Sequence, residues 1–153
     1  MAVRHTLIRR PPEAVWAVLS DGDKYDQWVV GPDESDEVDS RWPAPGSSIR
    51  YTVRVGPWSF QGHTVVRVCE RNQRLELEVE SGPLGTARVA IELRRWGDDC
   101  LVLVDEHPLT GPGAKLHSMA TDAFLQLRHR SMLARLDRVV RRTTDSPGHV
   151  AVV

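Results

Sequence analysis

The chain has 153 residues, 41% of them hydrophobic, and a formal net charge of -1. A chain of this size is expected to form one domain and can bury about two-thirds of its unfolded surface, enough for a core. Domains that bind nucleic acid are usually clearly basic, so the charge argues against nucleic acid as a partner. The two cysteines show no CxxC or Cys/His ligand spacing, which predicts free thiols and indicates no metal site or other cofactor.

The segment Met1–Arg10 carries charge throughout and lacks the apolar core of a signal peptide. No apolar run approaches the length that crosses a membrane. We therefore expect a cytoplasmic protein with no membrane span, present as a monomer or homodimer.

The first third of the chain predicts a strand, two short helices and a weak edge strand. Val3–Arg9 reads as the strand, and a helix begins at Pro12, a residue favoured at the first helical position. The polar cluster Ser20–Asp23 ends this helix and can cap a second one that carries Trp28. Asp33–Arg41 is acidic and poorly patterned, which indicates a strand at an edge of a sheet.

Between Ser48 and His107 the pattern changes to strict alternation of apolar and polar residues, which is typical of strands with one buried face. Short turn sequences rich in glycine, proline, asparagine and aspartate separate the runs, so an antiparallel meander is predicted. The predicted strands are Ser48–Val55, Trp58–Val68, Leu75–Glu80, Ala87–Arg94 and Leu101–His107.

The last of these strands is apolar on both faces and allows two registers. Either Val102, Val104 and Glu106 point inward, or the residues that alternate with them do. The following segment, Pro108–Gly113, contains two prolines and two glycines and is predicted to be a loop at the mouth of the fold.

One long helix is predicted over Gly113–Arg142, which contains many good helix formers and no proline. At 100° per residue its second half presents one broad apolar face, formed by Leu125, Met132, Leu133, Leu136, Val139 and Val140. Towards the N-terminus the same face turns polar and carries Ser118, Thr121, Asp122 and His129. Polar groups facing a core must be hydrogen-bonded or solvated. Either a cavity filled by water or ligand lies under this half, or a kink turns Phe124 inward.

Several motifs, in order, resemble the START/Bet v 1-like superfamily (SRPBCC), in particular its polyketide cyclase/dehydrase branch. The segments that carry the resemblance are Leu7–Trp16, Asp21 with Trp28, Pro45–Gly46, Glu106–Pro108, and Leu133 with Leu136. The resemblance covers residues 3–142 and implies an α+β helix-grip fold, in which a curved antiparallel sheet wraps around a long C-terminal helix. We expect a single domain over residues 1–143 and a tail over residues 144–153.

The resemblance implies an internal cavity that binds a hydrophobic small molecule, such as a lipid or an aromatic polyketide. Some members of the superfamily catalyse cyclisation and dehydration of polyketides, so an enzyme is the second hypothesis. An interaction module that uses the acidic segment Asp33–Asp39 is the third. The resemblance places Glu106 near the cavity mouth, which favours the register with Val102, Val104 and Glu106 inward.

Glu106 and His129 are the candidate catalytic residues. An inward carboxylate could accept a hydrogen bond from a ligand hydroxyl or, if desolvated, transfer protons. The alternative for Glu106 is a salt bridge to Arg128 or Arg54. Histidine titrates near neutral pH, but a structural histidine bonded to the sheet is the alternative for His129.

The other candidate ligand-binding residues are expected to line the cavity with rings, apolar groups and short polar groups. They are Trp28, Tyr51, Trp58, Phe60, Thr121, Asp122 and Leu125. For Tyr51 the alternative is core packing. The run Asp105–His107 is not a metal site, because adjacent residues of a strand point to opposite faces.

Overall fold

The structure is a computed structural model and describes residues 2–29, 32–55, 57–80, 86–110 and 119–144. Its strands are β1 (Ala2–Ile8), β2 (Pro32–Val38), β3 (Ser48–Val55), β4 (Trp58–Glu70), β5 (Arg74–Glu80), β6 (Thr86–Trp96) and β7 (Asp99–Thr110). Its helices are α1 (Pro12–Leu19), the 3-10 turn η1 (Gly22–Lys24), α2 (Tyr25–Trp28) and α4 (Met119–Thr144).

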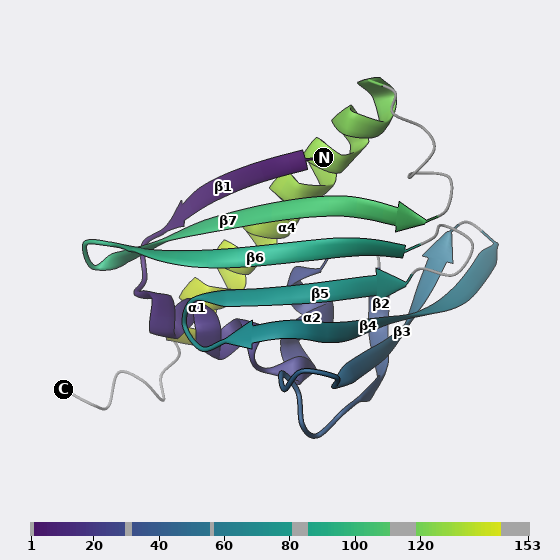
Figure 1. The fold of residues 1–153 in the computed structure, drawn as a ribbon, viewed down its shortest axis with the longest axis horizontal. Helices are drawn as coiled ribbons and strands as arrows, with labels where there is room; N and C mark the ends of the chain where they lie inside the picture. The colour runs from purple at the N-terminus through teal and green to yellow at the C-terminus, as the bar shows by residue number, and fades with distance from the viewer. Residues whose placement is uncertain (1, 30–31, 56, 81–85, 111–118, 145–153) are drawn as a thin grey trace.

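The strands form one seven-stranded sheet in the order β1-β7-β6-β5-β4-β3-β2. All neighbouring pairs are antiparallel, so β3 to β7 form the predicted meander. The predicted edge strand β2 pairs with β3, and β1 joins β7 at the other edge. Figure 1 shows α4 crossing behind the sheet, where it contacts β1, α1 and α2. The predicted α+β helix-grip fold is confirmed.

Local sequence signals explain where the short helices begin. Pro12 occupies the start of α1, where its missing N–H costs nothing, and Glu13 lies in the first turn near the positive end of the helix dipole. Asp21 caps η1, because its side chain accepts a hydrogen bond from the backbone N–H of Asp23 at 3.1 Å. Trp16 is buried in the core.

The apolar face of α4 packs against the rest of the protein along its second half. Each buried aliphatic side chain of this face stabilises the fold by about 1.5–3 kcal/mol. The buried residues are Met132, Leu133, Leu136, Val139 and Val140. The helix ends at Thr144, two residues beyond the predicted end at Arg142. Residues 113–118 of the predicted helix and 145–153 of the predicted tail lie outside the described residues.

The sheet has an apolar inner face towards α4 and a charged outer face. On β5, Leu75, Leu77 and Val79 are buried, whereas the glutamates between them are partly exposed. On the outer face a charge pair joins neighbouring strands, with 3.2 Å between Arg88 Nη2 and Glu76 Oε1.

The predicted mouth loop begins later than expected, because β7 continues through Pro108 to Thr110. Pro108 lies opposite Ala87, beside a register shift that leaves Leu109 of β7 without an opposite residue on β6. A proline lacks the N–H that a regular ladder needs, and a bulge relieves that requirement. The rest of the predicted loop, residues 111–113, lies outside the described residues.

Both cysteines are free thiols, Cys69 partly exposed and Cys100 buried. None of the helices in the described part of the chain combines the length and apolar character needed to span a membrane.

Candidate functional site

The inner face of the sheet carries one buried carboxylic acid among the described residues, Glu106, which is 2% exposed. Glu106 lies on β7 opposite Ala2 of β1 and Val89 of β6. Val102 and Val104 are also buried. The register in which these three β7 residues point inward is therefore confirmed.

An apolar row continues across the sheet from Glu106. Val89 lies opposite Leu77 of β5, and Leu77 lies opposite Val66 of β4; all three are buried. A carboxylate at the end of such a row is costly unless its charge is compensated. The predicted alternative partners, Arg128 and Arg54, have side chains outside the described part of the structure.

Arg4 introduces a positive charge on the same face, which the sequence analysis did not predict. It lies opposite Val104 on the β1–β7 ladder, so it shares the inner face with Val104 and is diagonal to Glu106. Long side chains at diagonal positions of adjacent strands can reach each other. Arg4 is partly buried, and its Nε atom has no hydrogen-bond partner. Arg4, Thr6 and Ile8 alternate along β1, and the pairing of β1 with β7 puts all three on the inner face. This alternation is the sequence signal that could have placed Arg4.

A cluster of aromatic rings fills the interior beside α2. The ring centroid of Tyr25 is 5.5 Å from that of Trp28 and 5.9 Å from that of Trp42, both edge-on. On another side Tyr25 stacks on Tyr51, with centroids 5.9 Å apart and an interplanar angle of 30°. The Tyr25 hydroxyl and the Thr64 hydroxyl are hydrogen-bonded at 2.5 Å. The cluster therefore joins α2 to the inner face of β3 and β4.

Tyr51 is 1% exposed, and its hydroxyl donates to the backbone oxygen of Glu80 at 3.4 Å. Core packing therefore accounts for its ring, and its role as a ligand-binding residue stays a prediction. The ring lies against Gly62, directly opposite on β4.

Trp28 is 1% exposed, and its indole Nε1 has no hydrogen-bond partner. By contrast, Trp42 Nε1 donates to the backbone oxygen of Leu19 at 3.2 Å. A buried donor without a partner costs about 1–3 kcal/mol, a cost that a hydrogen-bond acceptor beside it would remove. The described interior thus contains one predicted ligand-binding residue with an unused polar group.

Trp58 is 73% exposed and is therefore not a core residue, and its role as a ligand-binding residue stays a prediction. Trp58 opens β4 opposite Val55, next to the turn between β3 and β4. Further along the same face of β4, Gly62, Thr64 and Val66 are buried. Alternation places Trp58 on that face, but nothing covers the face at the start of the strand in the described part of the chain.

The remaining candidates cannot be placed by their side chains. Phe60 lies on β4, and Thr121, Asp122, Leu125 and His129 lie on α4, but all five side chains are outside the described part. The predicted cavity lies under this half of α4 and stays a prediction.

The run Asp105–His107 is divided between the two faces of β7. Glu106 is buried on the inner face, whereas Asp105 and His107 are partly exposed and contact each other, with 3.0 Å between His107 Nε2 and Asp105 Oδ2. The three side chains therefore cannot bind one metal ion, as the alternation predicts. No group of three or more potential metal ligands occurs among the described residues.

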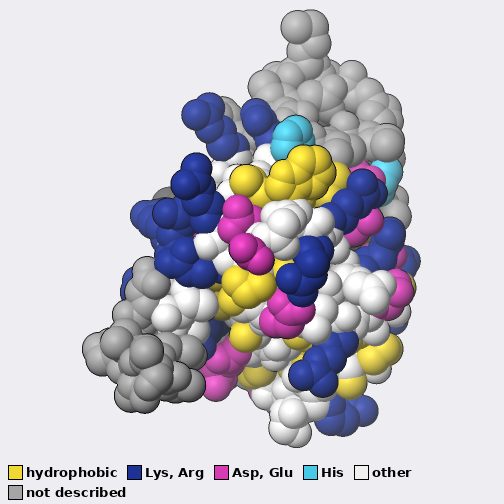
Figure 2. All heavy atoms as spheres, turned by 90° about the vertical axis from the view of Figure 1, so that its left-hand side faces the viewer, with side chains coloured by type: hydrophobic (Ala, Val, Ile, Leu, Met, Phe, Trp, Pro, Cys, Tyr) yellow, Lys and Arg dark blue, Asp and Glu magenta, His cyan; other side chains and the backbone are white. Residues whose placement is uncertain are grey.

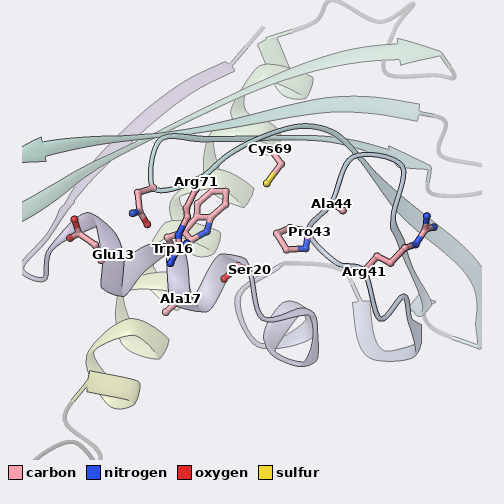
Figure 3. Close-up of a pocket in the computed structure, with 10 residues that line it drawn as sticks. Glu13, Trp16, Ala17, Ser20, Arg41, Pro43, Ala44, Cys69 and Arg71 are labelled. Carbon is pink, nitrogen blue, oxygen red and sulfur yellow. The ribbon is translucent and has the colours of Figure 1, made fainter. Parts of the chain in front are cut away.

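A separate open groove of about 600 Å³ runs beside α1 (Figure 3). None of the residues that line the groove belongs to the aromatic cluster, and Glu106 is not among them. Its lining residues are Glu13, Trp16, Ala17, Ser20, Arg41, Pro43, Ala44, Cys69, Arg71 and Asn72. Burial raises the pKa of the Cys69 thiol, so this thiol is not an activated nucleophile.

An antiparallel sheet that grips a long C-terminal helix, with polar groups on an otherwise apolar inner face, defines a class of protein. This is the helix-grip architecture of the START/Bet v 1-like superfamily, and the predicted superfamily is confirmed. Residues 9–140 match the family of Activator of Hsp90 ATPase homolog 1-like proteins, and the chain belongs to that family. It therefore has the ligand-binding fold of the superfamily.

Solved structures agree on the fold. A START superfamily protein from Mycobacterium smegmatis has a TM-score of 0.75 at 15% identity, over 94% of this chain and 98% of that one. Ara h 8.0201 has a TM-score of 0.70 at 10% identity, over 90% and 95%. DynU16, from the dynemicin biosynthetic locus, has a TM-score of 0.68 at 20% identity over 92% of this chain. The chain spans only 46% of DynU16. No curated protein matches the sequence.

Proposed function

We propose that the protein binds a hydrophobic or aromatic small molecule between the inner face of the sheet and α4, and that the ligand carries an oxygen acceptor. The observation that carries this proposal is the buried Trp28 Nε1, a donor without a partner beside a cluster of aromatic rings. A ligand carbonyl or hydroxyl oxygen would satisfy that donor, and the rings offer edges and faces to an aromatic body. Arg4 and Glu106 add a cation and an acid at one edge of the same face.

A titration of ¹⁵N-labelled protein with a flavonoid and with an aromatic hydrocarbon of similar size tests the proposal. We expect saturable binding of both and a downfield shift of the Trp28 indole N–H signal with the flavonoid only. Trp28→Phe keeps a ring but removes the donor, so it should weaken flavonoid binding by about tenfold and leave hydrocarbon binding unchanged. Trp96→Phe, at a residue that is 63% exposed, is the matched control. If no apolar ligand binds saturably, the proposal is wrong.

A second candidate function is a polyketide cyclase or dehydratase. Glu106 favours it, because a carboxylic acid that is 2% exposed on an apolar face is suited to proton transfer. The fold shared with DynU16, a protein of a biosynthetic locus, also favours it. Turnover of a polyketide substrate that is lost in Glu106→Gln and His129→Ala, with folding retained, would support this function. Turnover that survives both changes would contradict it.

A third candidate is an interaction module, which the name of the matched family supports. Most of the acidic segment that is predicted as its surface lies on β2, one of the two edge strands of the sheet. Replacing Glu37, which is exposed, with lysine should then reduce capture of a basic partner in a pull-down. Unchanged capture would exclude this surface.

A further inference from the structure

Three arginines of α4 surround a small hollow on the side of the helix that faces α2. The hollow has a volume of about 230 Å³ and is lined by Gln27, Arg135, Arg138, Val139 and Arg142. Intervals of three and four residues place the arginines on one face of the helix. The hollow shares no residue with the aromatic cluster or with the groove beside α1.

These arginines have no acidic partner within salt-bridge distance among the described residues. Arg135 donates to the backbone oxygen of Val29, and Arg142 donates to Gln27 Oε1, both at 3.4 Å. By contrast, Arg141 on the same helix pairs with Asp137 at 2.8 Å. A guanidinium group has five N–H donors, so most donors around the hollow are left for another acceptor.

The placement of three like charges is unfavourable without a counter-charge. Like charges at helical intervals of three or four residues destabilise a helix by a few tenths of a kcal/mol per pair, about 0.2–0.5. The negative end of the helix dipole compensates cations only in the last turn, which includes Arg142 but not Arg135. Figure 2 shows Lys and Arg side chains gathered on the left of that view, the side on which α4 lies. An anion held between the three guanidinium groups would remove the repulsion.

We propose that this hollow binds a phosphate group, carried either by a small soluble molecule or by a lipid headgroup. Guanidinium groups bind phosphate through paired N–H donors and are preferred for this purpose over a point charge. Because Gln27 Oε1 accepts from Arg142, its Nε2 adds a neutral donor at the rim. The buried Val139 closes the floor of the hollow.

The test uses the full ¹⁵N-labelled chain, titrated with inorganic phosphate against sodium chloride at matched ionic strength. We expect saturable shifts of the Nε–Hε signals of the three arginines and of the Gln27 amide. The double variant Arg138→Gln/Arg142→Gln should weaken binding by about tenfold or more. Arg141→Gln, on the same helix but already paired, is the matched control and should stay close to the wild-type affinity.

A second arm separates the two sources of phosphate. Co-sedimentation with phosphatidylcholine vesicles is compared with and without phosphatidic acid, for the wild type and the same variants. Saturable binding of free phosphate identifies a soluble ligand, and binding only to phosphatidic acid vesicles identifies a headgroup. The proposal is overturned if neither arm shows a response that the double variant reduces, or if Arg141→Gln reduces it equally. Neither outcome depends on the ligand of the inner face, because the two sites share no residue.

Discussion

Replacing Gly62 with alanine is the sharpest test of how closely the sheet packs under Tyr51. Gly62 lies in a regular part of β4, opposite Tyr51. A Cβ atom at this position would lie 2.6 Å from the backbone oxygen of Glu80 and 2.7 Å from Tyr51 Cε2. Both separations are well inside van der Waals contact, and one of the two atoms belongs to the backbone.

The Tyr51 ring has little room to move away. Tyr51 stacks on Tyr25 and donates its hydroxyl to Glu80, so the ring is held on two sides. Overpacking of a core of this kind costs about 1–3 kcal/mol. For a chain of this length each kcal/mol lowers the Tm by about 2–4 °C, so Gly62→Ala should lower it by about 2–12 °C.

Thermal unfolding followed by circular dichroism, together with urea denaturation, measures the effect. Gly97→Ala is the control: its φ is +63° and no atom lies within 4 Å of the added Cβ, so backbone strain of about 1 kcal/mol is its only cost. In a Tyr51→Ala background Gly62→Ala should cost less than in the wild type, because one of the two contacts is gone. A loss no larger than that of Gly97→Ala, or an equal loss in both backgrounds, would refute the packing argument.

Three other predictions concern single interactions. Tyr25→Phe and Thr64→Val should each cost about 1–3 kcal/mol in urea denaturation, and the double variant less than their sum, because each single change already removes the hydrogen bond between the two buried hydroxyls; additive losses would contradict this. Burial raises the pKa of Cys100 from 9.0 to about 11, so the free energy of unfolding should fall as pH rises from 9 to 11, where only the unfolded chain loses the proton. Cys100→Ala should flatten that part of the profile, and an unchanged slope would show that another group is responsible. Arg67→Ala removes an exposed ion pair to Glu78 and should lower the free energy of unfolding by less than about 1 kcal/mol, and by even less in 1 M salt. A larger loss that does not depend on salt would show that the pair is not a screened surface pair.

The fold could be predicted from local patterns because alternation and helix periodicity determine which side chains are buried. Leu75, Leu77 and Val79 alternate without interruption, and β5 has the burial that this pattern predicts. Leu133 and Leu136 likewise lie on the buried face of α4. The choice between two registers of β7 could not be made from alternation alone, since both faces of that strand are apolar, and the family resemblance was needed to favour Glu106 inward.

The candidate site was harder to predict because it depends on how far each element is covered. Trp58 has the correct alternation for the inner face but lies at the exposed start of β4. Arg4 was missed because one arginine in a short strand resembles any surface charge until its partner strand is known. The unused donor of Trp28 is invisible in a sequence, because hydrogen-bond satisfaction is a property of the surroundings and not of the residue type.

The pairing of β1 with β7 has a consequence for the order of folding. Ala2 lies opposite Glu106, so the first strand finds its partner only after almost the whole sheet has been synthesised. The strands from β2 to β7 pair with their sequence neighbours and need only short loops to close, whereas the β1–β7 contact closes a loop of about a hundred residues at a higher entropic cost. We therefore expect β1 to add to the edge of a meander that has already formed. During translation, the segment from Ala2 to Ile8 would remain an unpaired strand until β7 leaves the ribosome.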